Sequence, residues 1–122
     1  MKIIPTDIAS IAVHITTIAS IISMLEIKKK NIKAGLVIKP ETIISDVEPY
    51  FIHLDRVILM AVEPGYSAQK YIPKTSEKIS QIRKNFKEIE IVIDGGMHED
   101  TMREVMTLGA DSCVVCSVIV KS

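Results

Sequence analysis

Residues 91–96 read IVIDGG, an apolar β-branched run that ends on an aspartate with two glycines directly behind it. Such a run is typical of a strand that is buried on both faces. A carboxylate packs poorly at the end of this strand, but the glycines after it would let a ligand approach the backbone. Asp94 is therefore the first candidate catalytic residue. The alternative is structural, because aspartate before glycine often caps a turn with its side chain.

Apolar runs of the same kind recur along the chain, and segments with helical periodicity lie between them. The predicted strands cover residues 8–14, 34–38, 56–62, 91–94 and 112–116. The predicted helices centre on residues 18–25, 43–47, 73–86 and 99–108. Five strands and four helices result, and no linker divides residues 1–122 into more than one domain. Doubly apolar strands that alternate with helices indicate an α/β fold with a parallel sheet.

Composition excludes several classes of partner. Fifteen basic and fifteen acidic residues cancel, and the charges are scattered. This pattern argues against nucleic acid and against an anionic membrane surface as binding partners. Tryptophan is absent and other aromatic residues are few, so a base-stacking platform is not expected either.

One uncharged stretch, residues 8–25, meets the minimum length of a membrane span. Its one-sided helical period after residue 18 and its polar interruptions favour a soluble strand and helix instead. Cys113 and Cys116 would point to opposite faces of one strand, so they are not expected to form a disulfide or a joint metal site. Two buried thiols fit a reducing cytoplasm.

In a parallel α/β fold, functional sites lie at the carboxyl ends of the strands. Four features fall at that end: His14, the loop from Glu63 to Tyr71, Asp94 and Ser117. His14 stands alone, and a single histidine of this kind is more often a hydrogen-bonded structural residue than a ligand. The alternation by itself leaves open whether the sheet is flat or belongs to a barrel.

Four segments resemble the ribulose-phosphate 3-epimerase family: KAGLVIKPET (33–42), VEPGYSAQKYIPKTSEKI (62–79), IVIDGG (91–96) and LGADSCVVCSVIVKS (108–122). They occur in the family's order, and the resemblance extends over nearly the whole chain from about Ile8. The family's fold is a TIM (β/α)8 barrel, which needs about 200 residues or more. The resemblance therefore implies a partial barrel of about five parallel strands with four helices, equivalent to the fourth to eighth strands.

The resemblance also implies a reaction. Family members invert C3 of a ketose phosphate by removing a proton on one face and returning one on the other, with a divalent metal at the enediolate oxygens. Asp94 matches an aspartate that is both an acid/base and a metal ligand, whereas the family's other ligands belong to earlier strands. Substrate contacts are implied at six positions: Met60, Pro64, Gly65, Gly95, Gly96 and Ser117.

Some positions depart from the family pattern near the expected phosphate. The paired glycines later in the substrate loop are Ser67 and Ala68 here, and the glycine before Ser117 is Cys116. Side chains therefore stand where backbone N–H groups would approach a phosphate.

Three interpretations remain open from the sequence. The chain is the carboxyl-terminal part of an epimerase, a non-catalytic remnant or interaction module of the same fold, or an open flavodoxin-like binding module with strand order 2-1-3-4-5. A partial barrel would expose two edge strands, here residues 8–14 and 112–118, which are apolar, β-branched and free of proline. We therefore expect self-association.

Overall fold

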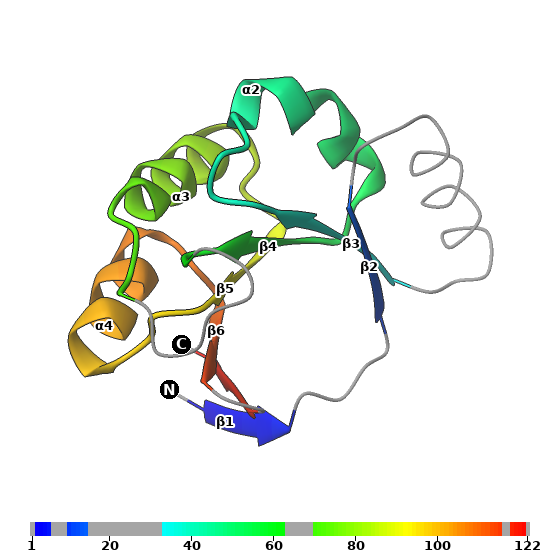
Figure 1. The fold of residues 1–122 in the computed structure, drawn as a ribbon. Helices are drawn as coiled ribbons and strands as arrows, with labels where there is room; N and C mark the ends of the chain where they lie inside the picture. Colours follow the sequence, from blue (N-terminus) through cyan, green and yellow to red (C-terminus); the bar gives the residue numbers. More distant parts are fainter. Residues whose placement is uncertain (1, 6–9, 15–32, 63–69, 116–117, 122) are drawn as a thin grey trace.

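The computed structural model describes residues 2–5, 10–14, 33–62, 70–115 and 118–121. The strands of these residues form one sheet in the order β1-β7-β6-β5-β4-β3-β2 (Figure 1). Their bounds are β1 (Lys2–Pro5), β2 (Ser10–His14), β3 (Lys33–Ile38), β4 (Arg56–Met60), β5 (Glu90–Asp94), β6 (Ser112–Val115) and β7 (Val118–Lys121).

The strands from β2 to β6 are parallel and follow one another in chain order. This arrangement confirms the predicted α/β class and the sequential strand order of a barrel segment. It contradicts the flavodoxin-like alternative, which needs a strand reversal within the sheet.

Helices cover one face of the sheet, on its outer side (Figure 1). They are α2 (Ile44–Val47), the 3-10 helix η1 (Glu48–His53), α3 (Lys74–Asn85) and α4 (Glu99–Leu108). Gly109 ends α4 with a φ of +116°, as expected for a left-handed helix stop. The predicted helix around residues 18–25 lies outside the described residues. Within the described part of the chain, no helix is long and apolar enough to cross a bilayer.

The hydrophobic core lies between this face of the sheet and the helices. Alternate strand residues are buried there against apolar residues of α3 and α4, as the two-residue period of a strand requires. The core includes Ala34, Leu36, Ile38, Val57, Leu59, Ala61, Ile91, Ile93 and Cys113 from the sheet side and Ile79, Ile82 and Val105 from the helices. The intervening residues lie on the opposite, inner face of the sheet, and of these Val37, Ile58, Met60 and Val114 are only partly buried.

The two ends of the chain depart from the prediction. No separate strand was predicted after residue 116, but Val118–Lys121 forms β7, which runs antiparallel to β6. The β-branched sequence VIVK disfavours a helix and suits a strand. The first residues form β1, which pairs with β7.

The exposed edges therefore differ from those expected. The predicted edge at residues 112–118 is wrong, because β6 is paired on one side with β5 and on the other with β7. The predicted edge at residues 8–14 is confirmed within the described sheet, where β2 pairs only with β3. An unpaired β6 would offer a free row of backbone donors and acceptors, and β7 covers that row.

The sheet must also curl. Seven strands about 4.8 Å apart would separate the outer strands of a flat sheet by about 29 Å. Pro5 ends β1 and Ser10 begins β2, so these two residues are joined by five peptide units that reach at most about 18 Å. The edges are thus closer together than a flat sheet allows, and Figure 1 shows the strands arranged around a curved wall.

Candidate active site

The carboxyl ends of β4, β5 and β6 bring together two of the predicted site residues. Met60 lies opposite Asp94, and Asp94 lies opposite Val114, in one hydrogen-bonded row. Gly95 and Gly96 follow directly. His14 is the last residue of β2 but is separated from β5 by two strands. Three other predicted substrate contacts, Pro64, Gly65 and Ser117, lie outside the described residues.

Asp94 is on the inner face of the sheet, since its neighbour Ile93 is buried in the core on the helix side. Asp94 is an exposed residue, yet partial burial of its carboxyl group raises the pKa of that group above the ordinary value. Burial is the only cause, so within the described residues no backbone N–H or cation stabilises the carboxylate. The turn-capping alternative would require such a hydrogen bond. Among the described residues, the turn-capping hydrogen bond is therefore not seen at Asp94.

The two glycines after Asp94 have positive φ angles, +102° at Gly95 and +68° at Gly96. A Cβ atom at Gly96 would lie 2.8 Å from the backbone N and Cα of Tyr71. At Gly95 it would lie 2.5 Å from a methyl group of Val62. The chain itself therefore requires glycine at both positions, whether or not a phosphate binds beside them.

Val62 and Tyr71 belong to the connection between β4 and α3, and its two ends are held together. The amide of Ile72 donates to the carbonyl of Ala61 at 2.7 Å, and the Ala61 amide donates to the carbonyl of Asp94 at 2.7 Å. The Tyr71 hydroxyl lies 2.7 Å from the hydroxyl of Ser76 in α3. The turn at Gly95 and Gly96 thus packs against the two ends of this connection, and this packing fixes the position at which β5 ends.

Substituting Gly96 by alanine should lower the free energy of unfolding by about 2–3 kcal/mol, because left-handed strain adds to a clash with the rigid Tyr71 backbone. Gly109→Ala is the matched control. Gly109 also has a positive φ, but its nearest neighbour is the flexible side chain of Arg83, 3.0 Å from the new Cβ. We expect a loss of about 1 kcal/mol there. Urea unfolding measures both, and equal losses would show that the Tyr71 contact does not matter.

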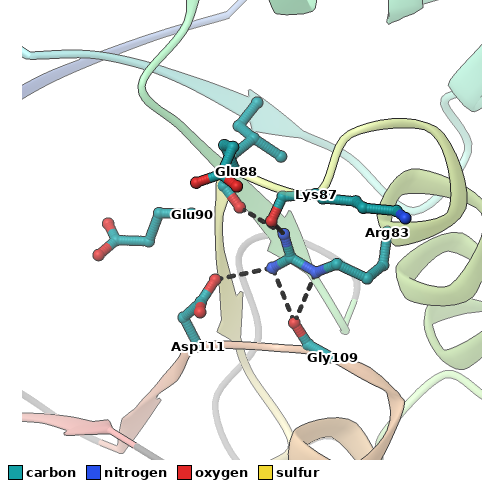
Figure 2. A pocket seen from close by; sticks show the side chains of 7 residues that line it. Arg83, Lys87, Glu88, Glu90, Gly109 and Asp111 are labelled. Atoms are coloured by element: carbon teal, nitrogen blue, oxygen red, sulfur yellow. Dashed lines mark hydrogen bonds and ion pairs between the residues drawn. The ribbon is translucent and has the colours of Figure 1, made fainter.

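The amino end of the sheet holds a different cluster, centred on Arg83 at the end of α3 (Figure 2). Its guanidinium group donates to the carbonyl of Gly109 from Nε and Nη2, at 3.1 and 2.8 Å. Nη2 also donates to Asp111 Oδ2 at 2.8 Å. Nη1 contacts the carbonyl oxygens of three residues at 2.8–3.2 Å: Phe86, Lys87 and Ile89.

A cavity of about 540 Å³ surrounds this cluster, and Arg83 and Asp111 line it. Every nitrogen of the guanidinium group already donates to a protein oxygen, so the arginine has no free donor for an anion. Stability is the usual role of residues at the amino end of barrel strands. We therefore assign the Arg83 cluster to the fold and not to a binding site.

Two aspartates make the same kind of hydrogen bond at this end of the sheet, from a strand's first backbone amides to a carboxylate oxygen. Asp55 Oδ2 accepts the amide of Ala34 at 2.7 Å, and Asp111 Oδ2 accepts the amide of Ile91 at 2.8 Å. Each aspartate directly precedes a strand and holds the start of the preceding strand. The sequence contained a signal for both, namely an aspartate just before an apolar run, in LDRVILM and GADSCVV.

A metal site does not emerge from the described residues. They contain no group of three or more His, Cys, Asp or Glu side chains that could hold a metal ion. Asp94 alone is a poor ligand set for a divalent cation, which needs several oxygen or nitrogen ligands.

The sequential parallel strands, the outer helices and a carboxylate at the carboxyl end of β5 define a protein of the (β/α)-barrel class. The sequence model of the ribulose-phosphate 3-epimerase family matches residues 2–120. This chain belongs to that family.

Its relatives agree. It is 39% identical over 114 residues to the ribulose-phosphate 3-epimerase of Aquifex aeolicus, a match that covers 89% of this chain and 51% of the relative. It is 36% identical to the enzymes of the same name from Escherichia coli K12 and Bacillus subtilis, over 76% of this chain and 43% and 45% of theirs. The chain thus spans about half the length of the curated relatives it matches.

Proposed function

We propose that this protein takes part in the epimerisation of a ketose phosphate at C3, and that Asp94 is one acid/base group of that reaction. The observation that carries the proposal is the position of Asp94. It ends a parallel strand at the functional end of the sheet, on the inner face, with a raised carboxyl pKa and a glycine turn behind it. The family supports the type of reaction, and residues 1–122 would form a single partial-barrel domain.

The chemistry of Asp94 follows from its surroundings. A general base works best when its pKa lies near the operating pH, and partial burial moves the pKa of Asp94 in that direction. The carboxylate would remove the C3 proton from one face of the sugar. Met60, opposite Asp94 in the row, would contact the carbon chain of the substrate. Inversion needs a second group on the other face, and the described residues assign none.

The family implies a divalent metal. The described residues offer no ligand set for it, so the proposal assigns them no metal. The same feature favours the second candidate function, a non-catalytic remnant that keeps the carboxyl end of the barrel without the reaction. The two candidates differ in whether a ketose phosphate binds at Asp94.

Two further expectations accompany the proposal. The edge strands β1 and β2 would allow self-association by strand pairing. Cys113 is fully buried, and burial raises the pKa of its thiol to about 11, so it is inert at neutral pH. Such a thiol supports a cytoplasmic location, and Cys116 lies outside the described residues.

The test is a titration of the Asp94 carboxyl carbon by NMR, with and without ribulose 5-phosphate. We expect a midpoint above the ordinary 3.8 and, on adding the sugar phosphate, shifts at Asp94 and in the glycine turn. Because the folded pKa is raised, the folded chain binds more protons than the unfolded chain between these two pKa values, and stability falls as pH rises through that window.

Asp94→Asn provides the matching control. It should be more stable than the unmodified chain at pH 7, by less than about 1 kcal/mol because solvent screens an exposed group, and no more stable at pH 3. A normal midpoint together with no response to ribulose 5-phosphate would contradict the proposed role of Asp94. A raised midpoint with no response would support the remnant.

A further inference from the structure

Lys39 lies directly after β3, at the carboxyl end of the sheet. In the register of the sheet Ile38 lies opposite Leu59, so one further step along both strands places Lys39 opposite Met60. Met60 in turn lies opposite Asp94. One row across the ends of β3, β4 and β5 therefore contains a lysine, a methionine and the candidate catalytic aspartate.

The alternation of β3 assigns the Lys39 side chain to a face of the sheet. Ile38 belongs to the core on the helix side, and Val37 before it lies on the inner face. Lys39 is the first residue of a turn in which the Thr42 amide donates to its carbonyl at 3.0 Å, so the bend falls on the two residues after it. The side chain of Lys39 therefore shares the inner face with Asp94.

The backbone at this position is held from the helix side. Lys78 of α3 donates from Nζ to the carbonyls of Lys39 and Pro40, at 3.2 and 2.6 Å. Lys39 is half-buried, whereas Lys33 at the other end of the same strand is exposed, as lysines usually are. Lys39 thus combines a fixed backbone with partial burial, which a lysine that only solvates the surface does not need.

The charges of Lys39 and Asp94 do not neutralise each other. Two strand spacings of about 4.8 Å place their Cα atoms about 10 Å apart, with Met60 between them. Burial alone raises the pKa of Asp94, whereas a cation in contact would lower that pKa. Within the described part of the chain, the ion pairs are formed by arginines and not by Lys39. The two opposite charges therefore flank the position of Met60.

A ketose phosphate that contacts Met60 would lie between these two charges. When Asp94 takes the proton, the C3–H bond breaks, its electron pair forms a C2–C3 double bond, and the C2 carbonyl oxygen becomes negatively charged. A cation beside that oxygen stabilises the enediolate more than it stabilises the uncharged ketone. The described residues offer no metal ligand set that could supply this charge.

We propose that Lys39 donates a hydrogen bond to the C2 oxygen of the substrate and stabilises the enediolate that Asp94 generates. The lysine keeps its proton throughout and is not a second acid/base group. This inference rests on the proposed function for the reaction itself.

The proposal implies a partial reaction that can be measured. The described residues supply no group that carries a proton to the opposite face, so Asp94 returns a proton to the face from which it took one. Its proton can exchange with solvent before it returns. The chain should therefore replace the C3 hydrogen by deuterium in deuterium oxide without inverting C3.

The test is proton NMR of ribulose 5-phosphate in deuterium oxide, which follows the loss of the C3–H signal with the full chain present, after subtraction of the rate without protein. Lys39→Met should lower kcat for exchange at least about 100-fold, as the loss of one oxyanion donor typically does. It should change KM less than about threefold, because the lost contact acts on the enediolate. Lys39→Arg should keep kcat within about tenfold, since it retains the charge and donors.

Lys33→Met is the matched control. It removes the same group from the same strand and the same face, six residues or about 20 Å away, which is beyond the range of screened charges in physiological salt. It should change kcat less than about twofold. Thermal unfolding establishes that each variant is folded, and Lys39→Gln replaces Lys39→Met if the methionine variant is not.

Three results would overturn the role of Lys39: equal exchange by Lys39→Met and the unmodified chain, an equal loss in Lys33→Met, or a raised KM at unchanged kcat. If exchange were nevertheless lost in Asp94→Asn, the proposed function would stand and only the inference about Lys39 would fail. No exchange by the unmodified chain would contradict both proposals.

Discussion

Replacing Arg83 by lysine should lower the free energy of unfolding by about 2–4 kcal/mol, although the charge is kept. The guanidinium group donates to the carbonyls of Phe86, Lys87 and Ile89 after α3, to the carbonyl of Gly109 after α4, and to Asp111 before β6. One ammonium group is a point charge with three donors and cannot span these acceptors. Carbonyls at two helix ends would lose their partner.

Arg103→Lys is the matched control for this experiment. Arg103 forms an exposed ion pair with Glu99 one turn away on α4, and such pairs contribute about 0.3–0.5 kcal/mol. Both variants keep the net charge and replace an arginine on a helix. Urea unfolding followed by circular dichroism gives the two free energies. If Arg83→Lys cost no more than Arg103→Lys, the Arg83 cluster would not stabilise the junction of α3, α4 and the sheet.

The parallel strands and their helices could be predicted because local pattern and tertiary structure agree there. The predicted run at 56–62 is β4 with two further residues, and β5 is the predicted run at 91–94 with Glu90 added. The helix after Pro73 is α3. In each case the apolar period matches the buried positions, so burial and hydrogen bonding require the same element.

The ends of the chain could not be predicted in this way. The last predicted strand ended at residue 116, but Val118–Lys121 forms a separate strand that pairs antiparallel with β6. The strand KIIP is only four residues long, and its one partner in the described sheet, β7, lies at the other end of the sequence. Pairing over such a separation leaves no periodic signal.

The candidate site likewise has one residue that the sequence predicted and contacts that it did not predict. Asp94 was found because a carboxylate after an apolar run is visible in the sequence. The contact of Gly96 with Tyr71 was not, because it joins residues 25 positions apart through a close backbone approach. Arg83 carried no signal either, since a basic residue in the last turn of a helix is common, and its partners Gly109 and Asp111 are distant in sequence.

The central proposal is that Asp94 is one acid/base group of the epimerase reaction and that the described residues supply no second one. The most direct measurement is the conversion of ribulose 5-phosphate to its C3 epimer by the purified chain, followed by NMR of the sugar. We expect a rate at least about 100-fold below that of the full-length Aquifex aeolicus relative, because loss of one general acid/base group typically costs 100-fold to 10,000-fold. Turnover within tenfold of that relative, abolished by Asp94→Asn, would contradict the claim.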